Sequence, residues 1–312
     1  MANITAAMVK DLRELTGAGM MDCKKALGET DGDMDAAVEY LRKNGQAKAE
    51  KKAGRIAAEG LCKVVLKDDR TAAVVEVNSE TDFVAKNEVF QSFVAAVADQ
   101  AVDSSAADMD AFMEEKWAAD ESLTVKEALS SQISIIGENM NIRRFKQVVE
   151  ENGVVVSYIH AGGRIGVLVD VETSVVNDAV KEALTNLAMQ IAALNPKYVS
   201  RDEVSADYIA HEKEILLAQI MNDPKESQKP EKVINGMIEG RISKELKEVC
   251  LVDQVYVKAE DGKQSVGKYV EEVAKANGAK ITIKGFVRYE TGDGIEKKEE
   301  NFAEEVAKQM GQ

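Results

Sequence analysis

The sequence has little of the chemistry from which enzymes and metal sites are built. Its 312 residues include three cysteines and two histidines, and neither C-x-x-C nor H-E-x-x-H occurs. A zinc site would need scattered ligands, whereas zinc sites usually draw on closely spaced Cys and His side chains. The phosphate-binding motifs G-x-x-x-x-G-K-S/T and G-x-G-x-x-G and the nucleophile motif G-x-S-x-G are also missing. We therefore expect a protein that is not an enzyme, holds no cofactor or metal, and works by binding.

Long apolar runs and targeting signals are also missing. No apolar stretch approaches the ~18–20 residues that a membrane-spanning helix needs, so we expect no membrane contact. Residues 1–5 lack the basic start and apolar run of a signal peptide. Cys23, Cys62 and Cys250 are an odd and widely spaced set, which argues against a disulfide framework. Together these features predict a reduced, cytoplasmic protein.

Basic side chains are in the minority, 40 against 55 acidic ones, which gives a net charge of −15 at pH 7. Residues 1–55 hold 10 basic and 9 acidic side chains, so the excess of negative charge lies in the rest of the chain. One small basic cluster is most simply a solvated face, because it is too small for a nucleic-acid patch on so acidic a chain: Lys48, Lys51, Lys52 and Arg55. We expect no direct binding of nucleic acid.

Residues 1–55 form the first predicted module, a three-helix partner-docking unit with a connector. Met8, Leu12 and Leu15 recur at helical spacing and should face a small core. Glycines separate three expected helices, the last of which should stop at Asn44–Gly45. The helices are expected at about residues 6–16, 20–27 and 34–44. They should form a compact bundle, followed by a helical or flexible connector.

From residue 56 the pattern predicts an α+β core of two related subdomains, over residues 56–150 and 151–290. Each begins with a β-hairpin rich in β-branched residues, followed by a helix that can cover one face of it. The expected strands are residues 61–66, 71–77, 154–159 and 164–171, and the expected helices are residues 89–102 and 175–194. An ungapped overlay of the two hairpins matches Gly60 with Gly153 and Val75 with Leu168.

Residues 200–250 predict a helical hairpin inserted into the second subdomain. Apolar positions alternate spacings of three and four, as in a coiled coil, and residues 223–230 contain two prolines that should form the tip. The expected seam is Val204, Tyr208, His211, Ile215, Ala218 and Asn222 against Ile234, Ile238, Ile242 and Leu246. Gly236 and Gly240 would permit close approach of the two helices.

The remaining segments are less distinctive. Residues 103–121 are acidic and rich in alanine, and a helix is expected at residues 123–136. After the hairpin we expect a helix at 266–276, a strand at 281–289 and a C-terminal module at 291–312 with a short helix from about Phe302.

Thr81, Asp82, Phe83 and Val84 follow the second strand of the first hairpin and precede its helix. On position alone this is most simply a helix entry, in which Thr81 or Asp82 caps the helix and Phe83 turns inward. The alternative is a functional loop, since loops on a rigid scaffold often carry binding residues.

Three further residues, in two places, are open to both a structural and a functional interpretation. Met20 and Met21 are adjacent on a predicted helix, so they point about 100° apart and one of them should be exposed, as on a contact surface. His160 lies in a predicted turn, where local backbone could satisfy its ring as readily as a partner could.

Five segments of the chain are distinctive: TGAGMMDCKKAL at 16–27, EVNSETDFVA at 76–85, GENMNIRR at 137–144, HAGGRIGVL at 160–168, and residues 286–296. These segments resemble the elongation factor Ts family, the guanine-nucleotide exchange factors of elongation factor Tu. Their order along the chain is that of the family, and they extend over most of it.

The resemblance implies roles for particular residues. In the family, the segment matching Thr81, Asp82, Phe83 and Val84 lies beside the nucleotide site of the partner GTPase and disturbs its Mg²⁺ coordination. The segment matching Arg13, Met20 and Met21 contacts a helix of the same GTPase domain. The turn that contains His160 faces the partner's third domain. The resemblance also implies that the N-terminal three-helix module is UBA-like.

The expected function is therefore that of a translation elongation factor, which binds GDP-loaded elongation factor Tu and promotes GDP release. A 2:2 assembly or self-association is compatible with the sequence. The alternative is a non-catalytic acidic scaffold or chaperone-like interaction protein that joins partners through its helical parts. Release of fluorescent GDP from the partner GTPase would separate the two.

Overall fold

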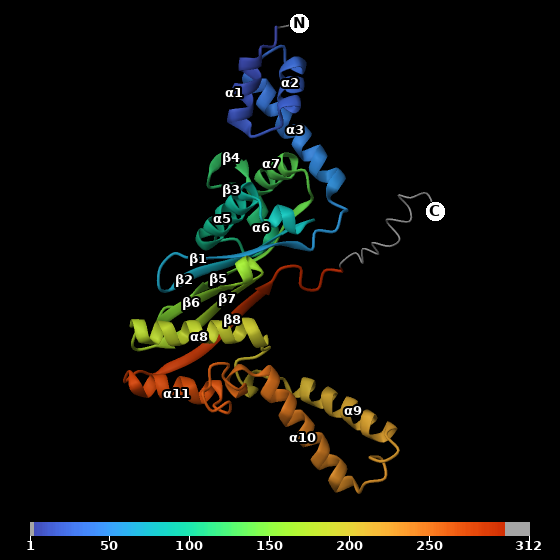
Figure 1. Ribbon diagram of the computed structural model, residues 1–312, viewed down its shortest axis with the longest axis vertical. Helices are drawn as coiled ribbons and strands as arrows, with labels where there is room; N and C mark the ends of the chain where they lie inside the picture. Colours follow the sequence, from blue (N-terminus) through green and yellow to red (C-terminus); the bar gives the residue numbers. More distant parts are fainter. Residues whose placement is uncertain (1–2, 297–312) are drawn as a thin grey trace.

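The computed structural model describes residues 3–296, so the helix expected from about Phe302 lies outside the described residues. The chain combines helices with small antiparallel sheets, which confirms the α+β class. Figure 1 shows a three-helix module at one end, two sheets in the middle and a helical hairpin at the other end. Within residues 3–296, no helix is both long and apolar enough to cross a bilayer.

The N-terminal module consists of α1 (Ala6–Thr16), α2 (Met20–Glu29) and the first part of α3 (Met34–Lys52). Thr5 and Asp33 cap α1 and α3, because their side chains accept backbone N–H groups that have no partner within the helix. The module has its own small core, made of Val9, Leu12, Cys23, Ala26, Leu27 and Ala37. Leu15, expected in this core, is 69% exposed instead.

Helix α3 does not stop at Asn44–Gly45 as expected, but continues to Lys52. The second half of α3 packs against α7 (Val125–Ile136), and Gly45 is buried there. A Cβ at Gly45 would lie 3.7 Å from Cβ of Ser134, an ordinary contact distance, so this position lies directly against α7. Tertiary packing thus overrides the weak helix preference of Asn-Gly.

The first sheet has the order β1 (Glu59–Leu66), β2 (Thr71–Ser79) and β5 (Met140–Val149), all antiparallel. Helix α5 (Glu88–Asp103) covers one face together with α7. Phe90, Phe93, Val94 and Val97 of α5 are buried, as predicted. Strand β5 was not expected, and the acidic segment before α7 holds α6 (Met109–Glu114) and the small hairpin β3 (Lys116–Trp117) and β4 (Asp120–Thr124).

The second sheet has the order β6 (Gly153–His160), β7 (Ile165–Thr173) and β8 (Ile281–Glu290). Helix α8 (Asp178–Leu194) covers its outer face, and α11 (Val266–Ala276) packs against α8. Short 3₁₀ turns lie at Ala161–Gly163, Arg201–Glu203 and Leu251–Asp253.

The two sheets pack face to face. Their inner faces meet through a cluster of buried residues contributed by both hairpins: Ala72, Val74, Val155 and Leu168. Val75 points the other way, into the core under α5, so the expected match of Val75 with Leu168 is wrong. The second hairpin is one residue longer, since Gly60 pairs with Asn78 but Gly153 pairs with Glu172. One residue reverses the face of a strand side chain.

A pair of carboxyl groups spans the two sheets. Glu150 follows β5 directly, and Asp170 lies on β7 with Lys284 of β8 nearby, 3.4 Å from the Glu150 carboxylate. Burial, together with a hydrogen bond to Glu150 and its negative charge, raises the pKa of Asp170 to about 6. Asp170 therefore takes up its proton in weak acid, at a higher pH than an ordinary aspartate.

The inserted hairpin consists of α9 (Ala206–Asn222) and α10 (Glu231–Val249), joined by the tip at 223–230 as expected. The predicted seam is correct on α10, where Ile234, Ile238, Ile242 and Leu246 are buried. Before and at the start of α9 the prediction is correct for Val204 and Tyr208, but it is wrong further along, because His211, Ile215, Ala218 and Asn222 are exposed. The residues of α9 in the seam are Tyr208, Ile209, Leu216 and Ile220.

Gly236 and Gly240 do not lie in the seam either. Both are exposed, and a Cβ at either position would meet no atom within 4 Å. The apolar spacing on α9 suited two faces equally well, so sequence alone could not choose the one that packs.

These glycines generate a stability prediction. Gly236→Ala and Gly240→Ala should each stabilise α10 by about 0.5–1 kcal/mol, because alanine loses less backbone entropy in a helix and nothing obstructs its methyl group. Slower hydrogen exchange of the α10 amides would measure the gain. Gly153→Ala is the contrast: its Cβ would lie 1.9 Å from the Val171 carbonyl oxygen, so that variant should lose stability.

The carboxyl pair generates a pH prediction. Because the pKa of Asp170 in the folded chain lies above its ordinary value of 3.8, folding is favoured while Asp170 holds its proton, and this contribution is lost as pH rises through about 6. Asp170→Asn, whose amide can still donate to Glu150, should therefore raise the free energy of unfolding at pH 8 by roughly 1–2 kcal/mol but change it little at pH 4. Equal effects at both pH values would contradict it.

Candidate functional site

The segment from Thr81 to Val84 forms a short exposed helix at the end of β2. Helix α4 (Asp82–Ala85) begins after Thr81, whose hydroxyl accepts the backbone N–H of Val84 at 3.3 Å. Val84 is partly buried against the first core and Ala85 is buried in it. Phe83 is 80% exposed, so the expectation that it turns inward is wrong, whereas Thr81 is the cap as expected. The segment thus projects an aromatic ring into solvent.

Asp82 adds a negative charge beside this ring. Its carboxylate lies 2.6 Å from the ammonium group of Lys86, one turn further along. The hydrogen bond from Lys86 holds the pKa of Asp82 below its ordinary value, so the carboxylate stays ionised at neutral pH. An exposed pair of this kind contributes little to stability, which leaves the carboxylate able to change partners.

The base of α4 is held by two carboxylates, Glu138 just before β5 and Glu80 just after β2. The carboxylate of Glu138 accepts hydrogen bonds from the backbone N–H of Glu80 (3.1 Å), the N–H of Thr81 (3.0 Å) and the Thr81 hydroxyl (2.7 Å). In return, Glu80 accepts the backbone N–H of Asn139 at 2.5 Å. These residues fix where α4 leaves the sheet.

The N-terminal module presents a second exposed apolar surface around the turn between α1 and α2. Met20 and Met21, the first residues of α2, are 59% and 74% exposed, so both methionines face solvent and not only one. Arg13 and Leu15, near the end of α1, are exposed as well. Exposed methionines suit a contact surface, because their flexible side chains adapt to a partner.

The turn after β6 contains His160. The ring is exposed, and its Nδ1 lies 3.0 Å from the hydroxyl of Tyr158, a side chain and not the local backbone considered above. Ala161 and Gly162 both have positive φ, at 47° and 66°, so the turn is tight and holds His160 at the strand end. Arg164, in the same turn, lies 3.8 Å from Glu59 at the start of β1.

The predicted site residues fall into two places. Helix α4 and the turn after His160 both contact β1, so they lie on the central part of the molecule. Arg13, Met20 and Met21 lie on the terminal module. A cleft of about 990 Å³ separates this module from the first core, lined by Leu15 and Val38 on one side and Val89 and Trp117 on the other. The exposed residues are therefore spread over two parts of the molecule, the terminal module and the central sheets.

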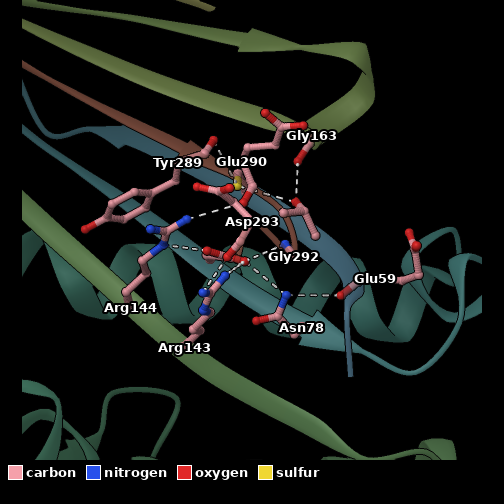
Figure 2. Close-up of polar contacts among 12 residues, drawn as sticks. Glu59, Asn78, Arg143, Arg144, Gly163, Tyr289, Glu290, Gly292 and Asp293 are labelled. Carbon is pink, nitrogen blue, oxygen red and sulfur yellow. Dashed lines mark hydrogen bonds and ion pairs between the residues drawn. The ribbon is translucent and has the colours of Figure 1, made fainter. Parts of the chain in front are cut away.

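A buried network behind these surfaces was not predicted (Figure 2). Glu76 of β2 is completely buried, and its carboxylate accepts hydrogen bonds from Arg143 (3.1 Å), Arg144 (2.5 Å), Asn78 (3.1 Å) and the backbone N–H of Gly292 (2.8 Å). The guanidinium of Arg144 also lies 4.2 Å from the centre of the Tyr289 ring. One indication of this network was present in the sequence: Glu76, Arg143 and Arg144 lie within segments that resemble one family.

The same network joins the end of β8 to the first sheet. Arg143 donates to the carbonyl of Asp293 at 2.6 Å, and Cys62 of β1 contacts Thr291. Gly292 has φ of 75°, and a Cβ there would lie 2.1 Å from the Ala58 carbonyl oxygen, so only glycine fits. Burial raises the pKa of the Cys62 thiol to about 11, which keeps it protonated.

These contacts fix the position of α4 and of the turn after β8 against the first sheet. Within residues 3–296, no group of three or more His, Cys, Asp or Glu side chains is arranged to hold a metal ion. What the described chain offers is a set of exposed apolar and charged surfaces on a stiff scaffold.

Comparison with known proteins gives one consistent family. The sequence model described as Elongation factor TS matches residues 80–293. Proteins named Elongation factor Ts from Clostridium novyi (strain NT) and Clostridioides difficile (strain 630) are 52% and 53% identical over 310 and 311 residues, respectively. These matches include 99% of this chain in both comparisons, and 99% and 100% of the respective relatives. Since matched residues extend over both sheets, the helical hairpin and the N-terminal module, the chain belongs to the elongation factor Ts family and has a role in translation elongation.

Proposed function

We propose that this chain is the guanine-nucleotide exchange factor of elongation factor Tu: it binds the GDP-loaded GTPase and promotes release of GDP so that GTP can bind. The observation that carries the proposal is the exposed Phe83, with Asp82 beside it, on a segment fastened to a rigid core. Membership of the family supports the same role.

The thermodynamic part of the mechanism is linkage. A factor that binds the nucleotide-free GTPase more tightly than the GDP-bound form must weaken GDP binding by the same factor. Fast release also requires a ternary state in which both are bound. The surface around Met20 and Met21 would supply affinity for the partner, and His160 a further contact on the other sheet.

The kinetic part falls to α4. We propose that Thr81, Asp82, Phe83 and Val84 reach the partner's nucleotide site and displace its Mg²⁺. A divalent ion that bridges phosphate and protein oxygens is a large local countercharge for the diphosphate, so its displacement should speed GDP release. The chain contributes no covalent chemistry and no cofactor to this step.

The modular organisation is part of the proposal. We propose a division at residues 55, 150 and 290, a UBA-like first module and two related core subdomains. The separate apolar cores support the division. Gly60 and Gly153, which occupy like positions in the two hairpins, support the relatedness of the subdomains. A cytoplasmic location follows from the proposed role, and a 2:2 assembly with the partner remains a prediction.

A scaffold that joins partners without any exchange activity is the second candidate, because the net charge of −15 and the projecting helical hairpin would suit one. It predicts binding of elongation factor Tu with no change in GDP release.

Changes in α4 test the exchange step. Phe83→Ala and Asp82→Ala should each slow GDP release at saturating factor by tenfold or more. The first removes the aromatic ring, and the second the negative charge, that would act at the partner's nucleotide site. Neither should change the free energy of unfolding by more than about 0.5 kcal/mol, since both side chains are exposed. Leu66→Ala, at the opposite end of β1 and 47% exposed, is the matched control.

The measurement is stopped-flow release of fluorescent GDP with Mg²⁺ present and again after EDTA. The advantage of wild type over Phe83→Ala should shrink once EDTA has removed the ion. Wild-type release by both variants with Mg²⁺ present would show that α4 is not the exchange element.

Changes in the N-terminal module test docking. Met20→Ala with Met21→Ala should raise the concentration of factor needed for half-maximal release several-fold and leave the maximal rate unchanged, because affinity and not the exchange step is altered. Met221→Ala, an exposed methionine near the tip of the helical hairpin, controls for loss of a methionine side chain. A lower maximal rate with unchanged half-saturation would contradict the assignment.

A further inference from the structure

The base of α4 lies where the first sheet ends. Ser79 and Met140 form the last pair of the β2–β5 ladder on this side. Beyond that pair, the backbone N–H groups of Glu80, Thr81 and Asn139 have no strand partner. The carboxylates of Glu138 and Glu80 accept all three, each from the opposite segment. Side chains thus continue the connection where the backbone ladder stops.

Glu138 also sets the cap of α4. The Thr81 hydroxyl donates to Glu138 at 2.7 Å and accepts the N–H of Val84 at 3.3 Å, so the carboxylate orients the hydroxyl that begins the helix. A four-residue helix has no stability of its own, because helix formation has a costly nucleus. The direction of α4, and with it the position of Phe83, therefore depends on Glu138 at one end and on Val84 and Ala85 in the core at the other.

The backbone before Glu138 is built for this contact. Gly137 ends α7 with φ of 90°, a left-handed conformation that favours glycine and turns the chain from the helix towards β2. Asn139 is buried, and its side chain donates to the carbonyl of Arg55 at 2.7 Å, so the connector from the N-terminal module is fastened at the same place.

We propose that Glu138 is a positioning residue for nucleotide exchange: it holds the Glu80–Thr81 turn so that Phe83 and Asp82 project from the core in the one direction that the exchange step uses. Glu138 is only partly exposed and is occupied by these three donors, so it acts through α4 and not on the partner's nucleotide. This inference rests on the proposed function of α4.

The test compares Glu138→Ala with Glu138→Gln. Alanine removes all three contacts, so the maximal rate of GDP release should fall about fivefold or more, while the half-saturating concentration, set mainly by the docking surface, changes less than twofold. Glutamine can keep the three contacts, because its oxygen accepts the two N–H groups and its amide nitrogen donates to the Thr81 hydroxyl. Glu138→Gln should therefore restore most of the maximal rate.

Glu127→Ala is the matched control. Glu127 accepts the N–H of Thr124 at 2.8 Å in the capping box of α7, so its loss removes a helix-cap carboxylate from the same subdomain without touching α4. It should lower stability but leave the maximal rate unchanged. Hydrogen exchange of the Glu80 and Thr81 amides in the free factor, faster in Glu138→Ala alone, reports the contact without any partner.

The outcomes separate the inference from the function on which it rests. If wild type accelerates release and Phe83→Ala does not, but Glu138→Ala equals wild type, the positioning role is wrong and the proposed function stands. An equal loss of rate in Glu127→Ala and Glu138→Ala would reduce the effect to general destabilisation and overturn the inference. No acceleration by wild type itself would overturn the proposed function instead.

Discussion

The structure depends on one buried negative charge. Glu76 lies on the central strand of the first sheet with no exposure to solvent, where an unpaired carboxylate would be very costly. Two guanidinium groups, one amide and one backbone N–H satisfy it, and they come from β2, β5 and the turn after β8. The hydrogen bonds to the Glu76 carboxylate therefore fix how the end of the second sheet lies against the first.

The segments that first pointed to the family turn out to be neighbours in space. Residues 76–85 and 137–144 pair along the β2–β5 ladder, and their side chains meet through Glu76 with Arg143 and Arg144 and through Thr81 with Glu138. Residues 286–296 supply Gly292 to the first of these contacts. The site thus consists of the short exposed helix α4 and the larger polar network beneath it, and most of the residues that resemble the family lie in this network.

Local pattern was enough to predict the α+β class, both hairpins and their covering helices, because each repeats apolar residues at a regular period. The tip of the helical hairpin was predictable from its two prolines, which cannot continue a helix. It failed where the deciding contact lies far away in sequence. Gly45 is helical because α7 lies against it, and the face of α9 that packs is chosen by α10. The exposure of Phe83 contradicts the local capping pattern, which fits Thr81 but cannot show that the core beneath is already filled by Val84 and Ala85.

Strand β8 reaches its place late during synthesis. It pairs with β7 although residues 174–280, including the whole helical hairpin, intervene, and Gly292 follows it directly. A growing chain must therefore wait until nearly all of these residues have left the ribosome before Glu76 can obtain its last donor, and pairings between distant segments form slowly. A translation factor of this topology can complete its own core only after β8 has been made, and a product that stops before Gly292 lacks one of the donors to the buried Glu76 carboxylate.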